Sequence, residues 1–322
     1  MLRALLIAAV AIAVLSAVAF ILSRRDIARE RARVAQSSIA TTRCGPIEFG
    51  SIGRGPVVLS IHGAGGGWDQ GLDLAGWLGR KEYRVVAMSR FGYLRTPVPP
   101  DASAEAQADA HACLLDELGV SRAAVIGVSA GGPSALQFAI RHPDRCAALV
   151  LMVPGVYAPR PGGAPSVKSP SGVPALFDTA LRSDFLFWIL TRPLRPVAIG
   201  TILGTPTELV ARASESEKAR VDLMLRHILP VTLRRRGLVN DAAVISSIRR
   251  YDLEAISAPT LVISAADCGY GTYEPARYTA EHVRGARFVG FPTGGHLLVG
   301  HEDEVEAEIL AFLQHAMPAG AD

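Results

Sequence analysis

The stretch from Ala123 to Gly131 constrains the fold of this chain more than any other feature of its sequence. Residues Ala123–Val128 form a short apolar run that is typical of a buried strand, and the residues after Gly131 suit a helix. Between them lies the pattern Gly-x-Ser-x-Gly, with Ser129 at its centre. Gly127 and Gly131 have no Cβ, so they permit a sharp turn around a strained serine. The sequence therefore predicts a strand, a tight turn at Ser129 and a helix.

The predicted turn makes Ser129 a candidate nucleophile. Between a strand and a helix, this pattern is typical of a nucleophile elbow, which exposes a serine hydroxyl at the start of a helix. Backbone N–H groups at a helix N-terminus can stabilise the oxyanion that forms when a serine attacks a carbonyl. Such a serine also needs a base, an acid that orients the base, and donors for the oxyanion. The rest of the sequence contains candidates for each.

His296 is the candidate base, and Asp267 is the candidate acid. His296 lies in a loop after the predicted strand Arg287–Phe291, and Asp267 follows the predicted strand Thr260–Ser264. The carboxyl ends of parallel strands are where α/β sheets place their functional loops. His301 is the alternative base, but it lies further into the final helix, and a helix-capping role is the alternative for Asp267. The chain order is then serine, aspartate, histidine.

Two backbone N–H groups are candidates for an oxyanion hole. One belongs to Ala130, directly after the candidate nucleophile, and the other to Ala64 in the loop His62–Gly67. Small residues there let the backbone approach a substrate carbonyl. The His62 ring is expected to be structural. Three aromatic residues are candidates for lining a substrate pocket, with core packing as the alternative: Trp68, Phe91 and Tyr93.

Strands alternate with helices through most of the chain, which predicts a mostly parallel sheet. Gly45–Gly55 suggests an antiparallel hairpin, and Val57–Ile61 is the first of the buried strands. We expect the core of the fold to comprise residues 45–153 and 253–322. The alternation breaks at residues 154–252, where prolines and apolar helical pieces predict an inserted helical cap or lid.

The N-terminal residues 1–23 form a candidate membrane segment. Ala4–Leu22 is almost entirely apolar and close to the length that crosses a bilayer. It is either a signal anchor followed by a polar linker at residues 24–44, or a signal peptide with a cleavage site near Ala17–Ala19, in which case the protein is exported. The arginine-rich flank favours the cytoplasmic side for an anchored domain, but the very short preceding segment leaves the side open. Phe185–Leu190 is expected to be the inner face of a cap helix, with membrane contact as the alternative.

Charge and cysteine content limit the classes of partner. Five arginines and two acidic residues between positions 24 and 33 account for the whole net charge of +3. The remainder is near neutral, so nothing indicates nucleic-acid binding. The four cysteines, at positions 44, 113, 146 and 268, contain no C-x-x-C pair. We therefore expect neither a metal site nor a disulfide framework, and the predicted chemistry requires no cofactor.

Together these motifs resemble those of the α/β-hydrolase superfamily over residues 45–315. The resemblance rests on the Gly-x-Ser-x-Gly elbow, the His-Gly-x-Gly loop at His62–Gly65, and the acid and histidine after the last two strands. It implies the α/β-hydrolase fold, in which helices flank a mostly parallel central sheet, with a helical cap insertion and here an N-terminal transmembrane helix. Ser264 and Ser89 stand where many relatives carry Gly and Asp. The serine nucleophile argues against the epoxide hydrolases and haloalkane dehalogenases, which use aspartate.

The resemblance implies a serine hydrolase that cleaves carboxylic esters or related acyl compounds through a Ser129–His296–Asp267 triad and an acyl-enzyme. Members of the superfamily also hydrolyse C–C bonds, cleave amides or iminopeptides, transfer acyl groups, or act as lyases, and the cap decides among these activities. A non-catalytic ligand-binding protein on this fold is the alternative from another class. The presence of all three triad candidates argues against it. The substrate and the oligomeric state stay open.

Overall fold

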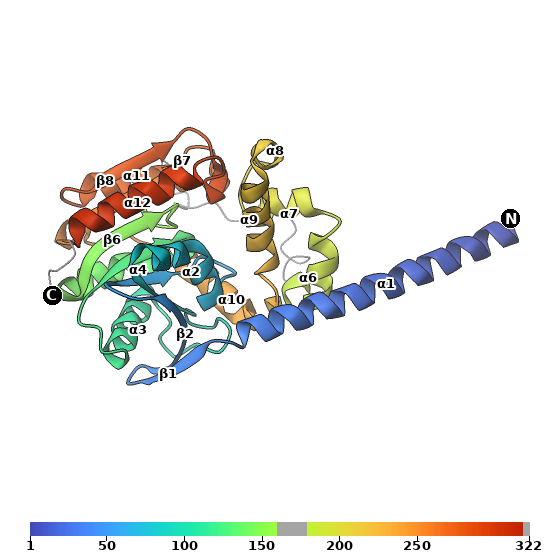
Figure 1. The fold of residues 1–322 in the computed structure, drawn as a ribbon, viewed down its shortest axis with the longest axis horizontal. Coiled ribbons are helices and arrows are strands. Elements are labelled where there is room, and N and C mark those ends of the chain that lie inside the picture. The colour runs from blue at the N-terminus through green and yellow to red at the C-terminus, as the bar shows by residue number, and fades with distance from the viewer. Residues whose placement is uncertain (160–178, 318–322) are drawn as a thin grey trace.

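The computed structural model describes residues 1–159 and 179–317 and contains one eight-stranded sheet (Figure 1). The strand order is β1-β2-β4-β3-β5-β6-β7-β8. The strands from β3 to β8 are parallel to one another, whereas β2 is antiparallel to both β1 and β4. Their bounds are β1 Ser38–Thr42, β2 Gly45–Gly53, β3 Val57–Ile61, β4 Arg84–Met88, β5 Ala123–Val128, β6 Cys146–Met152, β7 Thr260–Ala265 and β8 Arg287–Phe291.

The predicted mostly parallel sheet is confirmed, and β3, β5 and β8 have the predicted bounds. β3 and β5 are mostly apolar runs of five and six residues, as expected for strands whose two faces are both covered. The antiparallel hairpin differs from the prediction. Its first strand, β1, lies inside the predicted linker and pairs with β2 through a turn at Arg43 and Cys44. The sheet therefore begins before residue 45.

Helices cover the two faces of the sheet. The helices α3 (Ala104–Glu117), α4 (Gly132–Arg141) and α11 (Tyr273–His282) pack on one face, where they share an apolar cluster with β3 and β5. The helices α2 (Trp68–Ala75) and α12 (Glu302–Ala316) pack on the other face. Each fully buried Leu, Val or Ile in these clusters contributes about 1.5–3 kcal/mol to folding. The carboxyl ends of the parallel strands β3 to β8 thus lie along the same edge of a sheet that is packed on both faces.

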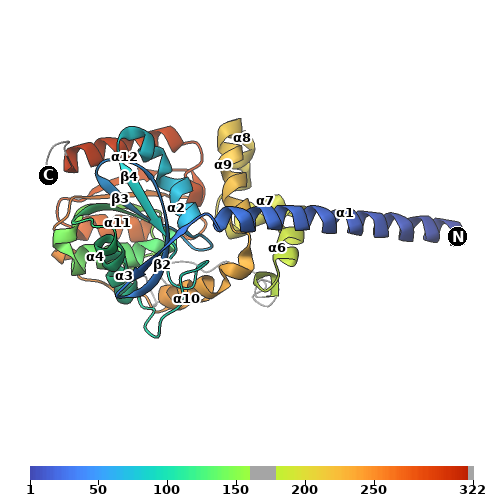
Figure 2. The same cartoon turned by 60° about the horizontal axis from the view of Figure 1, so that its bottom comes forward.

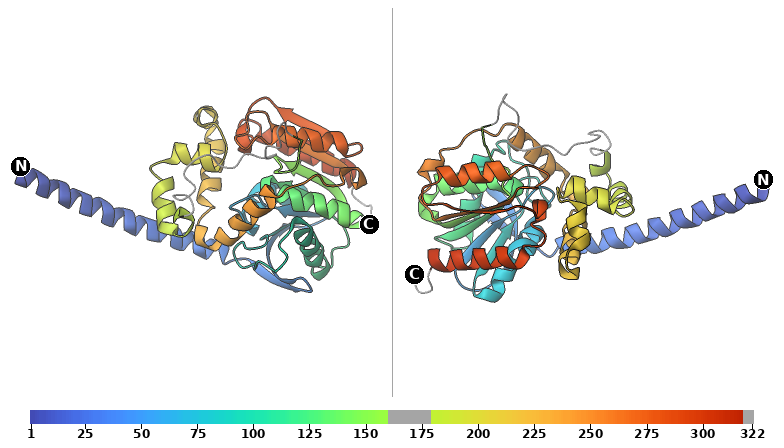
Figure 3. Two further views of the ribbon diagram at one scale, coloured as in Figure 1. Left: turned by 180° about the vertical axis from the view of Figure 1, so that it is seen from behind. Right: turned by 90° about the horizontal axis from the view of Figure 1, so that it is seen from above.

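Five helices lie in the described part of the predicted cap, of which residues 160–178 lie outside the described residues. Helices α6 to α9, yellow in both views of Figure 3, stand at one end of the sheet body, and α10 runs from them against the body. Val221 and Met224 belong to their own apolar cluster, separate from the two that cover the sheet. We call this part the insertion (residues 179–247). Its helices are α6 Asp184–Thr191, α7 Arg195–Ile202, α8 Thr207–Arg212, α9 Glu215–Arg226 and α10 Arg235–Ser246.

Two buried ion pairs fasten the insertion to the sheet body. Arg90, after β4, donates to both carboxylate oxygens of Asp241 on α10, at 2.5 and 2.7 Å. Arg234, at the start of α10, pairs with Asp69 on α2 at 2.7 Å. Burial by itself would raise the pKa of Asp69, but Arg234 and Arg33 outweigh it and hold that pKa below its usual range. Asp69 is therefore charged and paired.

Helix α1 runs without a break from Leu2 to Val34, so the first part of the predicted linker is helical. Its N-terminal half projects away from the body, as Figure 2 shows, and its large apolar side chains are exposed. The segment Arg3–Val34 is long and apolar enough to cross a membrane, although a signal sequence would have the same properties. Its C-terminal half lies beside α6, where the Phe20 and Phe185 rings are 6.0 Å apart.

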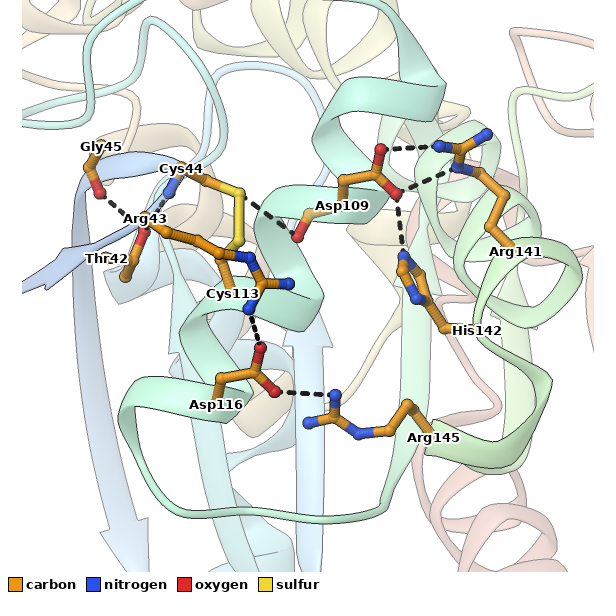
Figure 4. The surroundings of a disulfide bond; sticks show 10 residues. All are labelled: Thr42, Arg43, Cys44, Gly45, Asp109, Cys113, Asp116, Arg141, His142 and Arg145. Atoms are coloured by element: carbon orange, nitrogen blue, oxygen red, sulfur yellow. Dashed lines mark hydrogen bonds and ion pairs between the residues drawn. A yellow bond between two sulfur atoms is a disulfide. The ribbon is translucent and has the colours of Figure 1, made fainter.

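A disulfide joins Cys44, in the β1–β2 turn, to Cys113 on α3 (Figure 4). The expectation of no disulfide is therefore wrong, because the fold brings together two cysteines that are 69 positions apart. Ion pairs surround the bridge, including one between Arg43 and Asp116 at 2.5 Å. Cys146 and Cys268 are free and buried. In the chain-entropy view, closing a loop of this length stabilises the fold by about 4 kcal/mol.

The buried ion pairs predict a large effect of one substitution. Asp241→Ala leaves the Arg90 guanidinium buried without its counter-charge, so we expect a loss of about 3–5 kcal/mol in the free energy of unfolding. Urea denaturation of the detergent-purified full chain measures it. Arg277→Ala, which removes an exposed ion pair with Glu274, is the control and should leave the midpoint unchanged. Equal midpoints for the two variants would contradict the role of the buried pair.

Candidate active site

The turn at Ser129 has the geometry of a nucleophile elbow. Ser129 follows β5 directly and has a φ of +50°, a left-handed conformation that non-glycine residues rarely adopt. It begins a short 3₁₀ turn, η2 (Ser129–Gly131), that leads into α4. A Cβ on Gly131 would lie 2.6 Å from the Ile61 carbonyl oxygen, and one on Gly127 would lie 2.5 Å from the Ala135 Cβ. The two glycines are therefore needed for close packing around the serine.

The structure brings the candidate base to the candidate nucleophile. The His296 Nε2 atom lies 2.9 Å from the Ser129 Oγ atom. His296 belongs to η7 (Gly295–Leu297), just after β8, and the two preceding glycines both have positive φ. The insertion supports this loop, since the His296 N–H donates to the Gly204 carbonyl at 3.1 Å. The Tyr270 ring packs edge-on against the imidazole, with ring centroids 4.8 Å apart.

The candidate acid Asp267 does not contact the imidazole of His296 in the described structure. Its carboxylate accepts hydrogen bonds from the Gly295 N–H at 2.8 Å and the Gly294 N–H at 3.2 Å. The atom beside His296 Nδ1 is instead the Sγ of Cys268, at 3.2 Å. Successive side chains after a strand point in different directions. Asp267 therefore faces the loop at Gly294 and Gly295, whereas Cys268, the next residue, faces the His296 ring.

Cys268 is the site residue that the sequence interpretation missed. Its thiol is buried, and the Thr272 hydroxyl donates to its Sγ at 3.1 Å. Burial by itself would raise the pKa of this thiol, but His296 and Thr272 outweigh it and lower the pKa to about 6. The only signal in the sequence was a cysteine directly after the candidate acid. The sequence pattern places the orienting residue just after the strand, but it does not choose between the neighbours Asp267 and Cys268.

The backbone around Ala64 is compatible with the predicted oxyanion hole. The neighbouring N–H groups of Gly63 and Gly65 are occupied by the Gln70 side chain and the Tyr93 hydroxyl, at 3.0 and 3.1 Å. Among the described residues, no acceptor is hydrogen-bonded to the Ala64 N–H. The Ala130 N–H lies in the first turn after Ser129, where helical N–H groups have no intrahelical acceptor.

The three candidate pocket rings are packed in the interior. Phe91 belongs to the apolar cluster under α3 and α4. Trp68 covers Gly50 of β2 and donates its indole N–H to the Val34 carbonyl at 3.3 Å. Tyr93 is fully buried, and its hydroxyl donates to Asp241 at 2.6 Å. These contacts are those of core packing, which is the alternative that the sequence left open for all three rings.

The two other histidines near these loops have structural contacts. His62 accepts a hydrogen bond from the Arg90 N–H at 2.9 Å, and burial together with the Arg90 charge lowers its pKa well below the ordinary value. His301 stacks on Phe291 at the start of α12, with centroids 4.1 Å apart. Within the described ranges, no group of three His, Cys, Asp or Glu side chains could hold a metal ion.

Comparisons with known proteins agree with this geometry. Residues 56–196 match the family model described as the alpha/beta hydrolase fold. An alpha/beta hydrolase fold protein from Nakamurella multipartita superposes with a TM-score of 0.69 at 25% identity, covering 87% of this chain and 99% of its own. An uncharacterized hydrolase of Bacillus subtilis is 26% identical over 84% of this chain and 95% of its own length. The fold, the elbow and these matches place the chain in the α/β-hydrolase superfamily.

One higher-identity relative aligns over a shorter stretch. A 2-hydroxy-6-oxo-6-phenylhexa-2,4-dienoate hydrolase of Comamonas testosteroni is 34% identical over 114 residues. That alignment covers 34% of this chain and 40% of the relative. The chain thus spans about two fifths of the length of this curated relative.

The packing at the elbow predicts different effects for one substitution at two glycines. The backbone at Gly131 suits any residue, so Gly131→Ala acts through the close contact of its Cβ with the Ile61 oxygen. We expect it to destabilise the fold by about 1–3 kcal/mol and to impair reaction of Ser129 with a fluorophosphonate probe. Gly200→Ala on α7 meets nothing within 4 Å and should preserve both. Thermal unfolding and probe labelling measure the two effects, and unchanged behaviour of Gly131→Ala would contradict the packing argument.

Proposed function

We propose that this protein is a serine hydrolase that cleaves carboxylic esters or related acyl compounds through an acyl-enzyme. The observation that carries the proposal is the 2.9 Å contact between Ser129 Oγ and His296 Nε2 at a strained turn. The candidate oxyanion donors lie at the same place, because a Cβ on Gly63, next to Ala64, would be only 3.1 Å from the Ser129 Cβ.

The chemistry follows from these contacts. His296 Nε2 takes the Ser129 proton while Oγ attacks the carbonyl carbon. The Ala64 and Ala130 N–H groups donate to the developing oxyanion, and in comparable sites each donor contributes about 3–4 kcal/mol to lowering the barrier. His296 then protonates the leaving alkoxide. Water attacks the acyl-enzyme by the same route, with His296 again as the base, and Ser129 is regenerated.

Hydrolysis of a C–C bond beside a carbonyl is a second candidate. The Comamonas testosteroni relative is named as a 2-hydroxy-6-oxo-6-phenylhexa-2,4-dienoate hydrolase. A fold, however, supports many chemistries on one arrangement of nucleophile and base. The insertion decides which acyl group reaches Ser129, so a substrate panel must include both classes.

Replacement of the nucleophile tests the proposal. We expect Ser129→Ala to reduce kcat for p-nitrophenyl esters by about 10⁴–10⁶-fold and to abolish fluorophosphonate labelling. Ser134→Ala is the matched control, because this serine lies one turn further along and its hydroxyl faces His111 and the Gly131 carbonyl. The control should keep both activities. Labelling that persists in Ser129→Ala, or that disappears in Ser134→Ala alone, would overturn the assignment of the nucleophile.

We also propose that α1 anchors the hydrolase domain to a membrane beside the insertion. Arg31 on α1 pairs with Asp184 on α6 at 2.6 Å, and Asp26 accepts the Trp188 indole N–H at 2.9 Å. Helices α6 and α7 and the turn between them also carry exposed large apolar side chains, namely Leu186, Leu194 and Val197. An apolar helix that is docked on helices with exposed apolar residues supports a common contact with the bilayer.

The disulfide favours the oxidising side of that membrane for the domain. Structural disulfides persist in oxidising compartments and are rare in the cytosol. The arginine-rich flank argues for the opposite side, but the segment before the apolar run also carries positive charge, at the N-terminal amine and Arg3. We give the covalent bond the greater weight because structural disulfides are rare in the cytosol.

Membrane attachment and side are open to a direct measurement. Carbonate-washed membranes should retain the full chain and release a variant that lacks residues 1–23, because α1 is the single unbroken helix in the described residues that is long and apolar enough to span a membrane. Intact spheroplasts treated with protease should lose the domain. A maleimide–polyethylene glycol should add to Cys44 and Cys113 only after reduction. Protection from protease, or labelling of both cysteines without a reductant, would place the domain on the cytosolic side.

A further inference from the structure

We propose that the Cys268 thiolate, in place of a carboxylate, orients His296 for its role as the base. The inference rests on the proposed function, and it concerns a positioning residue that acts through His296. Cys268 Sγ lies 3.2 Å from His296 Nδ1, while Ser129 Oγ lies 2.9 Å from Nε2. The imidazole thus lies between a thiol and the candidate nucleophile.

Local structure fixes the sulfur in this place. Cys268 lies in a tight turn after β7, in which its N–H donates to the Ala265 carbonyl at 3.2 Å and its carbonyl accepts from the Gly271 N–H at 2.8 Å. The Thr272 hydroxyl contacts Sγ from the opposite side, at 3.1 Å. Asp267 instead accepts hydrogen bonds from two backbone N–H groups, those of Gly294 and Gly295. The competing carboxylate therefore has a different task.

The protonation state of the sulfur decides which tautomer His296 adopts. A thiolate accepts a hydrogen bond from the Nδ1–H group, so the proton stays on Nδ1. The Nε2 lone pair is then free to take the Ser129 proton. A neutral thiol instead donates to Nδ1, so the ring proton moves to Nε2 and the base is lost. When Nε2 is protonated during attack, the imidazolium is paired with the thiolate. A charged sulfur thus supplies both functions that a carboxylate supplies in a serine triad.

This requirement predicts an acidic limit to activity. The pKa of the Cys268 thiol, about 6, lies well above that of an ordinary carboxyl group. The groups that face the sulfur are His296 from η7, the Thr272 hydroxyl at the start of α11, and Tyr270, whose pKa is raised by burial and by the Cys268 charge. As the pH falls through the titration of the Cys268 thiol, the fraction of thiolate falls, and kcat falls with it.

The test compares pH profiles of kcat and KM for p-nitrophenyl acetate in the detergent-purified full chain. We expect Cys268→Ala to lower kcat at least about 100-fold with little change in KM, because the wrong tautomer affects the base more than substrate binding. Cys268→Asp should recover activity to within about tenfold of wild type, because a carboxylate also accepts the hydrogen bond from the Nδ1–H. Cys146→Ser, at a buried thiol under the sheet, is the control and should match wild type.

Asp267→Asn separates the two neighbouring candidates. We expect it to keep the wild-type position of the acidic limb, because its carboxylate holds only the Gly294 and Gly295 N–H groups. Loss of that limb in Asp267→Asn, together with a wild-type profile in Cys268→Ala, would overturn the proposal and make Asp267 the orienting group. A wild-type kcat and profile in Cys268→Ala would overturn it as well.

A measurement on the ring distinguishes failure of this inference from failure of the proposed function. In imidazole ¹⁵N spectra at pH 8, His296 should carry its proton on Nδ1 in the wild type and lose this preference in Cys268→Ala and Cys268→Ser. These spectra report the tautomer directly, so they do not depend on substrate turnover or on the folding of the Cys268→Asp variant. The same tautomer in wild type and Cys268→Ala would overturn the inference even if esters are cleaved. Absence of ester cleavage and of Ser129 labelling would instead overturn the proposed function.

Discussion

The buried guanidinium of Arg90 is the group on which the geometry of the site most depends. Its Nε donates to the His62 carbonyl at 2.9 Å, and a terminal nitrogen donates to the Gly63 carbonyl at 3.2 Å. Its other partner is the Asp241 carboxylate, which also accepts the Tyr93 hydroxyl. One side chain after β4 therefore holds both the loop of the candidate oxyanion donor and a helix of the insertion. Burying this charge is costly, and only so complete a set of partners offsets the cost.

A second buried carboxylate connects three parts of the molecule that are distant in sequence. Asp69, at the start of α2, accepts from Arg33 at the end of α1 and from Arg234 at the start of α10. Helix α1, the sheet body and the insertion thus meet at one buried charge. Displacing either arginine would leave unpaired charge in the interior, so the three parts are coupled electrostatically as well as by apolar packing.

Local patterns predicted much of the fold and part of the site. Val57–Ile61 and Arg287–Phe291 are apolar strands bounded by turn residues, and the elbow at Ser129 is dictated by glycines within two positions. The failures concern long-range or single-residue geometry. The Cys44–Cys113 disulfide depends on the fold that joins the two cysteines, and Cys268 differs from the predicted acid by one position. Periodic patterns do not predict these two contacts. The first depends on the whole fold, and the second on the turn after β7, which sets the direction of each side chain.

The insertion contributes to both halves of the Ser129–His296 pair. On the nucleophile side, Asp241 of α10 fixes Arg90 and Tyr93, which in turn hold the loop next to Ser129. On the base side, Gly204 accepts the His296 N–H and also the Gly269 N–H, and its positive φ of 53° places this carbonyl between the two loops. A Cβ at Gly204 would lie 2.7 Å from the Tyr270 ring. The contact between nucleophile and base is therefore a property of the docked insertion together with the sheet.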